Sequence, residues 1–317
     1  MNFSAVTSQF WSLLLAGVAI GFIYVLISLG YTMVYGVLRL INFANSEIFM
    51  VGTFASIIVS RNFFGYNDSS DTIHGFKLYY TLAACLIAAM LMSGVTAVIV
   101  ELVAYRRLRA KGTNRLASLI SAIGTSIVLS EGARILTQSR PLASPRLLDK
   151  FFVFNLGTVG FRIDIIIVIV FAAGLFFAVD RFVNKTLLGK AIRAVSMSED
   201  TSRLMGINLN RVISATFFIG GLMTGAAAFL YDLVFENTRF NIGFNLGLAA
   251  FTAAVLGGIG NLRGAFFGGI TLGLIEVFAS AIFGAQWQAV TVFVVLVLVL
   301  LFKPNGLFGE AIQQSRV

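Results

Sequence analysis

The chain has 317 residues, of which 58% are hydrophobic and only 12% are charged, and its mean hydropathy is +0.92. Soluble globular domains carry about 25% charged residues, so this composition excludes a soluble fold. The formal net charge of +9 does not indicate nucleic-acid binding, because the lysines and arginines lie between apolar stretches, where membrane proteins carry them. The sequence therefore predicts an all-α, polytopic membrane protein.

Nine apolar stretches approach the length of about 20 residues that a helix needs to cross a bilayer. The first is long enough to be tilted or broken and the last is short, so we expect eight or nine transmembrane helices. No low-complexity linker divides the chain, and residues 1–317 are treated as a single transmembrane domain. The predicted spans are 11–37, 46–64, 78–104, 116–136, 163–183, 212–232, 245–260, 264–283 and 288–302.

The sequence also bears on an internal repeat and on the orientation of the chain in the membrane. Residues 41–43 (INF) resemble residues 242–244 (IGF), and each triplet precedes an apolar helix, which hints at an internal repeat. The most basic connections are those at 105–115 and 184–211, and the positive-inside rule places both in the cytoplasm. With nine spans, the N-terminus then lies outside and the C-terminus inside.

Patterns typical of enzymes, nucleotide sites and metal sites are missing from the sequence. The only Gly-Lys pair, Gly189-Lys190, lacks the other residues of a phosphate-binding loop. His74 and Cys85 are the only histidine and cysteine, so no zinc pattern exists. We expect no catalytic residue, no metal and no cofactor in this chain, and any ATP that drives it would be bound by another subunit.

Polar residues surround the start of the predicted span at 46–64. One interpretation is that Asn42, Asn45 and Glu47 line a path for a solute. The other is that Asn45 or Ser46 caps the helix and that Glu47 is favoured by the helix dipole. Ser121 and Thr125 belong to a run of hydroxyl residues on one side of a helix, which fits either a polar track or helix–helix hydrogen bonds.

Acidic residues at membrane depth are costly and are weighed one by one. Glu101 is expected to pair with Arg106 or Arg107, and Glu131 with Arg134, three residues further along the same helix. Asp232, at the end of a span, is expected to reach water. Glu276 lies deeper, without a cation nearby in sequence, and is the acidic residue best suited to a buried interaction.

Small residues dominate the segment 251–273. Glycines four residues apart let helices approach closely, and the glycines assigned to helix packing are Gly257, Gly260, Gly264 and Gly268. The chain breaks at 261–263, which fits a tight cytoplasmic hairpin between two spans better than a discontinuous helix beside a transport path.

The segment 189–211 is polar and basic, unlike the rest of the chain. Its apolar residues between Ala191 and Leu204 form only a partial helical stripe. The pattern alone leaves two interpretations open, a solvated connector or a segment on which a partner docks.

Three stretches together resemble one family. They are 30–47 (GYTMVYG followed by INFANSE), 119–124 (LISAIG) and 250–260 (AFTAAVLGGIG), and Gly189, Arg193 and 206–208 (GIN) add to the match. In this order and at this spacing they are similar to LivH-type permeases, the membrane subunits of ABC importers for branched-chain and other neutral amino acids. The family commonly has His-Gly where this chain has Asn45-Ser46, which weakens any transfer of substrate detail to that position.

The resemblance implies a bacterial inner-membrane permease subunit that forms half of a translocation path for branched-chain or other neutral hydrophobic amino acids. Its implied partners are a second, paralogous permease chain, two cytoplasmic ATPase subunits that bind ATP, and a periplasmic solute-binding protein. The segment at about 184–211 would couple to the ATPase, through Arg193, Glu199, Asp200, Gly206, Ile207 and Asn208. The residues expected along the solute path are Asn42, Asn45, Glu47, Ser121, Thr125 and Thr252.

Other transport functions remain as alternatives at this point. One is a urea or short-amide permease of the same type. A second is an ion-coupled secondary transporter that depends on Glu276, and a third is a passive channel. The polar segment at 184–211 distinguishes the ABC importer from a channel, because the importer needs such a segment and a channel does not; a secondary transporter would instead depend on a deep acidic residue and need no ATP.

Overall fold

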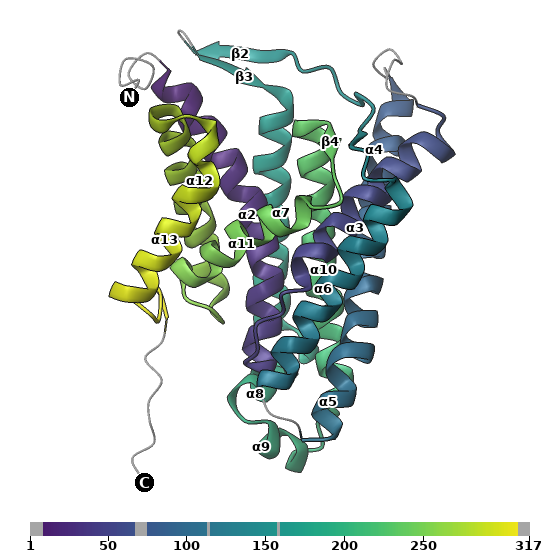
Figure 1. The fold of residues 1–317 in the computed structure, drawn as a ribbon, viewed down its shortest axis with the longest axis vertical. Helices are drawn as coiled ribbons and strands as arrows, with labels where there is room; N and C mark the ends of the chain where they lie inside the picture. The colour runs from purple at the N-terminus through teal and green to yellow at the C-terminus, as the bar shows by residue number, and fades with distance from the viewer. Residues whose placement is uncertain (1–8, 67–74, 113–114, 157–158, 310–317) are drawn as a thin grey trace.

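In the computed structural model, which describes residues 9–66, 75–112, 115–156 and 159–309, the chain is a bundle of long helices (Figure 1). Within these ranges, seven helical segments are long and apolar enough to cross a membrane. All seven coincide with predicted spans. They are α2 (Phe10–Leu38), α4 (Phe76–Val100) with η2 (Glu101–Arg106) and α5 (Arg107–Ala110), α6 (Arg115–Thr137), α7 (Ile163–Lys185), α10 (Leu209–Phe235), α12 (Leu262–Phe283), and η3 (Ala285–Trp287) with α13 (Gln288–Phe302).

The other two predicted spans are shorter helices that begin inside the bundle. Helix α3 (Asn45–Ile58) has 14 residues and continues into the π-helical turn η1 (Val59–Phe63), and α11 (Ile242–Gly257) has 16 residues. A membrane span needs about 20 residues, so α11 does not cross on its own. The first residues of both helices are buried.

These two short helices occupy equivalent places in two similar units. Each follows a long helix, α2 or α10, that ends at a non-glycine residue with positive φ, Arg39 at 50° and Glu236 at 54°. The connections, 39–44 and 236–241, have the same length. Counted from these ends, Ser46 corresponds to Gly243, so the register suggested by the triplets 41–43 and 242–244 is off by four residues, about one helical turn.

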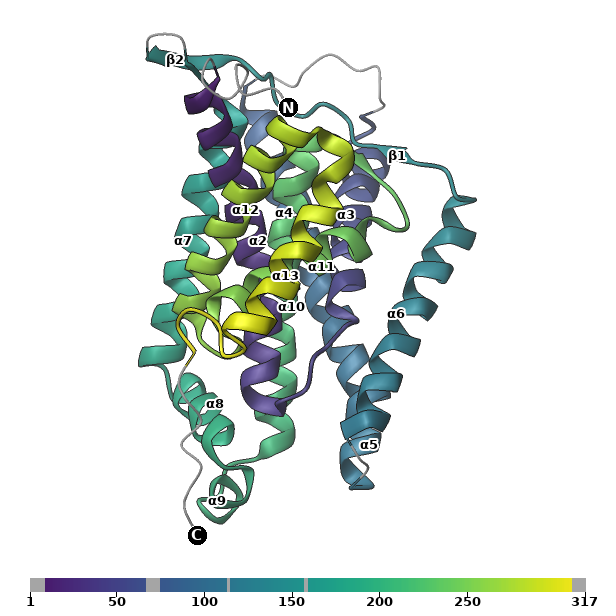
Figure 2. The same cartoon turned by 60° about the vertical axis from the view of Figure 1, so that its left-hand side comes forward.

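The two units run in opposite directions and meet in the centre of the bundle (Figures 1 and 2). A side chain at Gly243 would collide with the backbone of Ser46, so the first turns of α3 and α11 are in backbone contact. The long helices α2 and α10 also cross closely, at Gly30 and Gly220. They are the most buried spans of the bundle and form its core.

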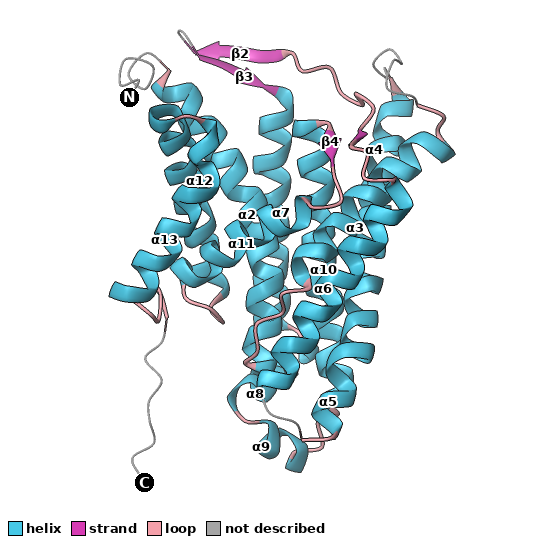
Figure 3. Ribbon diagram, in the orientation of Figure 1, coloured by secondary structure: helices cyan, strands magenta, loops and turns pink. Residues whose placement is uncertain are grey.

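The two ends of the bundle differ in character, as Figure 3 shows. One end carries the short antiparallel pairs β1 (Leu142–Ala143) with β4 (Asn237–Thr238), and β2 (Phe152–Leu156) with β3 (Val159–Arg162). The other end carries α5, α8 (Leu187–Met197) and α9 (Glu199–Leu204). The two basic connections predicted to be cytoplasmic therefore lie at the same end.

Helix α6 stands apart from the rest of the bundle (Figure 2). Only 17% of its most apolar window is buried, and Ile120 and Val128 are 69% and 71% exposed. Its apolar surface is thus available to lipid or to another chain.

Candidate functional site

A cluster of buried polar side chains lies where α3 begins. Asn42 and Asn45 are both 2% exposed. The Tyr105 hydroxyl, on η2, donates to Asn42 Oδ1 at 3.0 Å, and the Thr224 hydroxyl, on α10, donates to Asn45 Oδ1 at 3.3 Å. Asn45 Nδ2 also donates to the Ile27 carbonyl of α2 at 3.5 Å, so the start of α3 is tied to η2, α10 and α2. The sequence did not point to Tyr105 or Thr224.

Glu47 completes this group, which we call the α3 polar cluster (Asn42, Asn45, Glu47, Tyr105, Ser126 and Thr224). The Ser126 hydroxyl, on α6, donates to Glu47 Oε1 at 3.3 Å. Glu47 Oε2 and Asn42 Nδ2 are buried without a hydrogen-bond partner among the described residues. Leaving such an atom unpaired costs about 1–3 kcal/mol. The cluster therefore has one acceptor and one donor available to bind a polar solute, or to pair in a second conformation of the cluster.

Neither Asn45 nor Ser46 caps α3, as one interpretation expected, although Glu47 does lie in the first turn, where the helix dipole favours an acidic residue. The residue before the first turn of α3 is Ala44, and it makes no side-chain capping bond. Asn45 and Ser46 are already inside the helix, where the Ser46 hydroxyl donates back to the Phe43 carbonyl at 2.6 Å. The asparagine side chain instead faces α10, so its polarity serves contacts between helices.

The other predicted path residues do not join the cluster through hydrogen bonds. The Ser121 hydroxyl donates to the Ala104 carbonyl at 3.2 Å, a bond between α6 and η2, and Thr125 donates to the Ser121 carbonyl at 2.8 Å. Thr252 is fully buried and donates to the Leu248 carbonyl of its own helix at 2.8 Å. Of the hydroxyl run on α6, it is Ser126 that reaches the cluster.

The segment predicted to couple to an ATPase folds as two short helices with well-defined ends. The Thr186 side chain caps α8 by accepting from the Gly189 amide at 3.0 Å, and Ser198 caps α9. Gly206 has a φ of +80°, which other residues rarely adopt, and it ends α9. Asn208 caps α10 by accepting from the Arg211 amide at 3.2 Å. Ile207 joins this turn through a backbone bond to Ser202.

The charged residues assigned to this segment hold the two helices in place. Arg193 donates to the Asn184 carbonyl at 3.3 Å, which fastens α8 to the end of α7. Glu199 and Asp200 lie in the first turn of α9, where the helix dipole favours negative charge.

This segment also carries large apolar side chains that are exposed, which the sequence did not predict. Met197, Leu204 and Met205 are 80%, 88% and 78% exposed, at an end of the bundle that also carries many charges. We call them the α9 apolar surface. Large apolar side chains gathered at a polar end of a protein typically mark a contact with another protein. The partial stripe noted in the sequence contained Met197 and Leu204 but gave no sign that they face outward.

Two arginines connect this end to the core. Arg39, just after α2, donates through Nη2 to the carbonyls of Ser196 at 3.1 Å and Met197 at 3.3 Å, at the end of α8. Arg109 donates to Asn210 Oδ1 at 2.7 Å, which joins α5 to the start of α10. A movement of α8 would therefore displace Arg39 and with it the end of α2.

The predicted packing glycines lie where α11 turns back into α12. A methyl group at Gly257 would collide with the Gly264 carbonyl, and one at Gly268 with the Ala253 carbonyl. Gly260 differs, because it has a φ of +99° and only Tyr35 within 4 Å. It is a turn residue between the helices, and its spacing of four from Gly264 is incidental, since α11 has already ended at Gly257.

The predicted ion pairs are present, and one acidic residue departs from expectation. Glu101 accepts from Arg106 at 3.2 Å and lies 3.5 Å from Arg109, and Glu131 pairs with Arg134 at 2.6 Å. Asp232 was expected to reach water but is only 3% exposed. Asp232 lines a small pocket together with Ser56 of α3 and with residues of the stretch 144–147.

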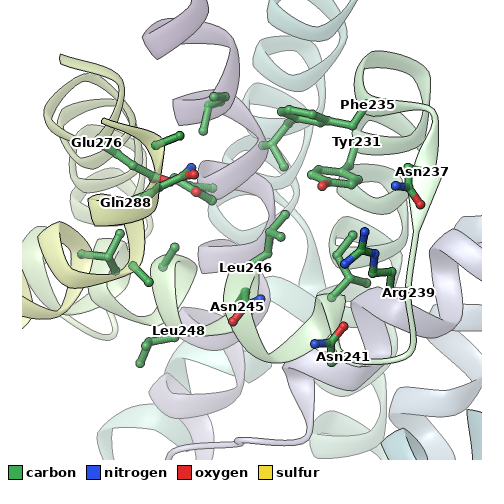
Figure 4. Close-up of a pocket in the computed structure, with 18 of the residues that line it drawn as sticks. Tyr231, Phe235, Asn237, Arg239, Asn241, Asn245, Leu246, Leu248, Glu276 and Gln288 are labelled. Atoms are coloured by element: carbon green, nitrogen blue, oxygen red, sulfur yellow. The ribbon is translucent and has the colours of Figure 1, made fainter. Parts of the chain in front are cut away.

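A cavity of about 550 Å³ lies between α2, α10, α11, α12 and α13, in the half of the bundle away from α8 and α9. Figure 4 shows Arg239 and Asn241 on one side of it, Glu276 with Gln288 on the opposite side, and Asn245 between them. The Gln288 amide donates to Glu276 Oε1. Most of the remaining lining is apolar. Sequence reasoning found Glu276 but missed the others, although 237–245 (NTRFNIGFN) is dense in asparagine.

Comparison with known proteins gives a consistent result. The family model described as "Branched-chain amino acid transport system / permease component" matches residues 13–302. The high-affinity branched-chain amino acid transport system permease protein BraD of Pseudomonas aeruginosa is 38% identical over 300 residues, which cover 94% of this chain and 95% of BraD. The corresponding LivH proteins of Salmonella typhimurium and Escherichia coli are 37% and 36% identical, over 93% of this chain and 94% of each relative.

Proposed function

Because this chain belongs to the family of branched-chain amino acid transport permease components, we propose that it forms half of a solute path beside a second permease chain. The chain is a permease component of a branched-chain amino acid ABC importer and a multi-pass protein of the bacterial inner membrane. The second chain, the ATPases and the solute-binding protein are part of the proposal.

The end that carries α8 and α9 is the proposed cytoplasmic, ATPase-binding end. Its support is the exposure of Met197, Leu204 and Met205 beside the basic connections, which the positive-inside rule places in the cytoplasm. This is the observation on which the proposal mainly rests. No nucleotide-binding loop occurs in the sequence, so the proposal assigns ATP to the partner subunits.

The α3 polar cluster is the proposed lining of the path. Its unpaired donor and acceptor lie at the meeting point of two helices that begin inside the bundle, the arrangement that many transporters use for a solute near the bilayer centre. Binding there must be weak enough for release, so a few polar atoms suffice. Ser121, Thr125 and Thr252 have weaker support, because their hydroxyl groups already bond to backbone carbonyls.

The experiment tests the ATPase contact and transport together. The chain is co-expressed with its candidate ATPase, second permease and binding protein, and the purified complex is assayed for ATP-dependent leucine uptake in proteoliposomes. The test variant replaces Leu204 and Met205 with alanine. The control is Leu136→Ala, which is 87% exposed like Leu204 at 88% but lies at the opposite end of the bundle.

Loss of two apolar anchors from an interface typically weakens binding tenfold or more, at about 1–2 kcal/mol each. We therefore expect the double variant to lose most of the co-purified ATPase and of the uptake, while Leu136→Ala keeps both. If the double variant retains its ATPase as well as the control does, α9 is not the docking surface. If the wild-type complex shows no ATP-dependent uptake, the proposed function itself fails.

A further inference from the structure

The cavity of about 550 Å³ has the size and the lining of a small-molecule site. Ligand sites typically measure about 300–1,000 Å³ and combine apolar walls with a few polar groups. Its polar side chains come mainly from the connection before α11, from Asn245 on α11 and from α12, η3 and α13, and its apolar side chains come mainly from α2, α10, α11 and α13. None of these residues belongs to the α3 polar cluster or to the α8–α9 end.

Arg239 is the only cation among the described residues that line this cavity. It is exposed and makes no ion pair or side-chain hydrogen bond with a described residue. In Figure 4 it lies on the same side of the cavity as Asn241, and Asn245 lies between it and the Glu276 side. A guanidinium group that is free in this way matches the fork of a carboxylate, which it binds through two parallel hydrogen bonds.

The two asparagines supply neutral donors and acceptors beside that cation. Asn241 immediately precedes α11, yet its side chain makes no capping hydrogen bond, and both asparagines are exposed. Each amide offers an oxygen for an ammonium group and two N–H donors for a carboxylate. An amino acid carries both groups on one carbon atom, so one arginine with adjacent amides can hold its whole polar head.

The apolar part of the cavity is suited to an aliphatic side chain. Ile20 and Ile23 of α2, Leu246 and Ala249 of α11, and Val292 of α13 line it, and none of them has a polar side-chain atom. Burial of a leucine-sized side chain against such walls contributes substantially to binding. On a further wall, the buried Glu276 carboxyl group accepts a hydrogen bond from the Gln288 amide.

We propose that this cavity is an outer recognition site for a zwitterionic aliphatic amino acid, with Arg239 on the α-carboxylate, Asn241 and Asn245 on the polar head, and the α2–α11 aliphatic wall on the side chain. The site lies in the half of the bundle opposite the ATPase-binding end, where solute from outside arrives first. This inference rests on the proposed function and adds the residues that bind and distinguish the solute.

The test measures solute binding to the permease without the binding protein, which has its own selectivity. In the complete permease–ATPase complex, Ala289→Cys places a thiol on the cavity wall, and the native Cys85 is fully buried and out of reach of a polar thiol reagent. The rate of thiol modification is measured with L-leucine, with L-leucinamide, which lacks the carboxylate, and without ligand. Ala143→Cys, exposed at the same end but outside the cavity, is the matched control.

We expect L-leucine to slow modification at position 289 and L-leucinamide to do so only at about tenfold higher concentration, since the analogue leaves the arginine without its partner. Adding Arg239→Gln should remove this preference, whereas Arg140→Gln, an exposed arginine elsewhere at the same end, should keep it. Position 143 should react at the same rate throughout.

Two results would overturn the inference. In one, L-leucine gives no protection at position 289 although the same preparation, with its binding protein, imports leucine with ATP. In the other, leucine and leucinamide protect equally in the presence of Arg239. Neither result contradicts the proposed function. A preparation without ATP-dependent uptake would instead contradict the proposed function itself, on which the inference about the cavity rests.

Discussion

Gly268→Ala tests whether the contact between α11 and α12 depends on the absence of a side chain. An added Cβ at Gly268 would collide with the Ala253 carbonyl and would also come within 2.7 Å of the Gly257 amide nitrogen. Both are backbone atoms held in regular helix, so they cannot turn aside as the end of a flexible side chain would. The two helices must separate locally to admit the methyl group.

Overpacking of this kind typically costs about 1–3 kcal/mol. At roughly 2 °C per kcal/mol for a chain of this size, the melting temperature should fall by about 2–6 °C. The matched control is Gly132→Ala, on α6, where an added Cβ has no atom within 4 Å. There the better helix propensity of alanine should leave stability unchanged or raise it by about 0.5–1 kcal/mol.

The measurement is thermal unfolding of each purified variant in the same detergent. Unfolding is monitored as the loss of the monodisperse peak in size-exclusion chromatography. We expect Gly268→Ala to lower the melting temperature and Gly132→Ala to leave it unchanged or raise it. If Gly268→Ala melts at the same temperature as Gly132→Ala, the helices tolerate separation, and close backbone approach does not explain the small residues of this segment.

Three further predictions follow from the polar contacts. Glu101→Gln should lower stability by about 3 kcal/mol by leaving two arginines without their buried partner, whereas the exposed Glu131→Gln should cost below about 1 kcal/mol in the same unfolding assay. Ser126→Ala should change the rate of leucine uptake and Ser130→Ala should not, because Ser126 donates to Glu47 whereas Ser130 donates to the Ile127 carbonyl of its own helix; equal rates would remove α6 from the path. Arg39→Gln should reduce the leucine imported per ATP hydrolysed without loss of the ATPase subunit, and an unchanged ratio would contradict its role as a link.

The helices were predictable from the sequence because a membrane span leaves a long, continuous signal. All seven long spans coincide with predicted stretches, and the two shorter ones, α3 and α11, were placed correctly but read as full spans. Hydropathy records how apolar a stretch is and not at what depth it begins. The pairs of Glu101 with Arg106 and of Glu131 with Arg134 were predictable as well, because the partners are only five and three residues apart in the sequence.

Contacts between distant segments were beyond the sequence. Thr224 reaches Asn45 across 179 positions and Ser214 reaches Glu101 across 113, and no local pattern indicates such pairs. Asp232 was misjudged for the same reason, since the residues that line a small pocket with it include Ser56 and Ser144, which lie far from it in the sequence. The resemblance to a family supplied the function, but the cavity around Arg239 required the fold.

The structure also links the two parts of the proposed mechanism through one short connection. Arg39 holds the end of α8 and at the same time begins the connection 39–44, which leads into α3. Asn42, within that connection, is bonded by Tyr105, and Asn45 and Glu47 follow directly. A displacement of α8 by the ATPase would therefore pull on the residues that line the proposed path, over only a few residues of chain. Because Asn42 and Glu47 already carry unpaired polar atoms, a second arrangement of the cluster can form new hydrogen bonds at little cost. Alternating access requires an element that can adopt a second arrangement when it is displaced from one end, and the proposed link through Arg39 would supply that displacement.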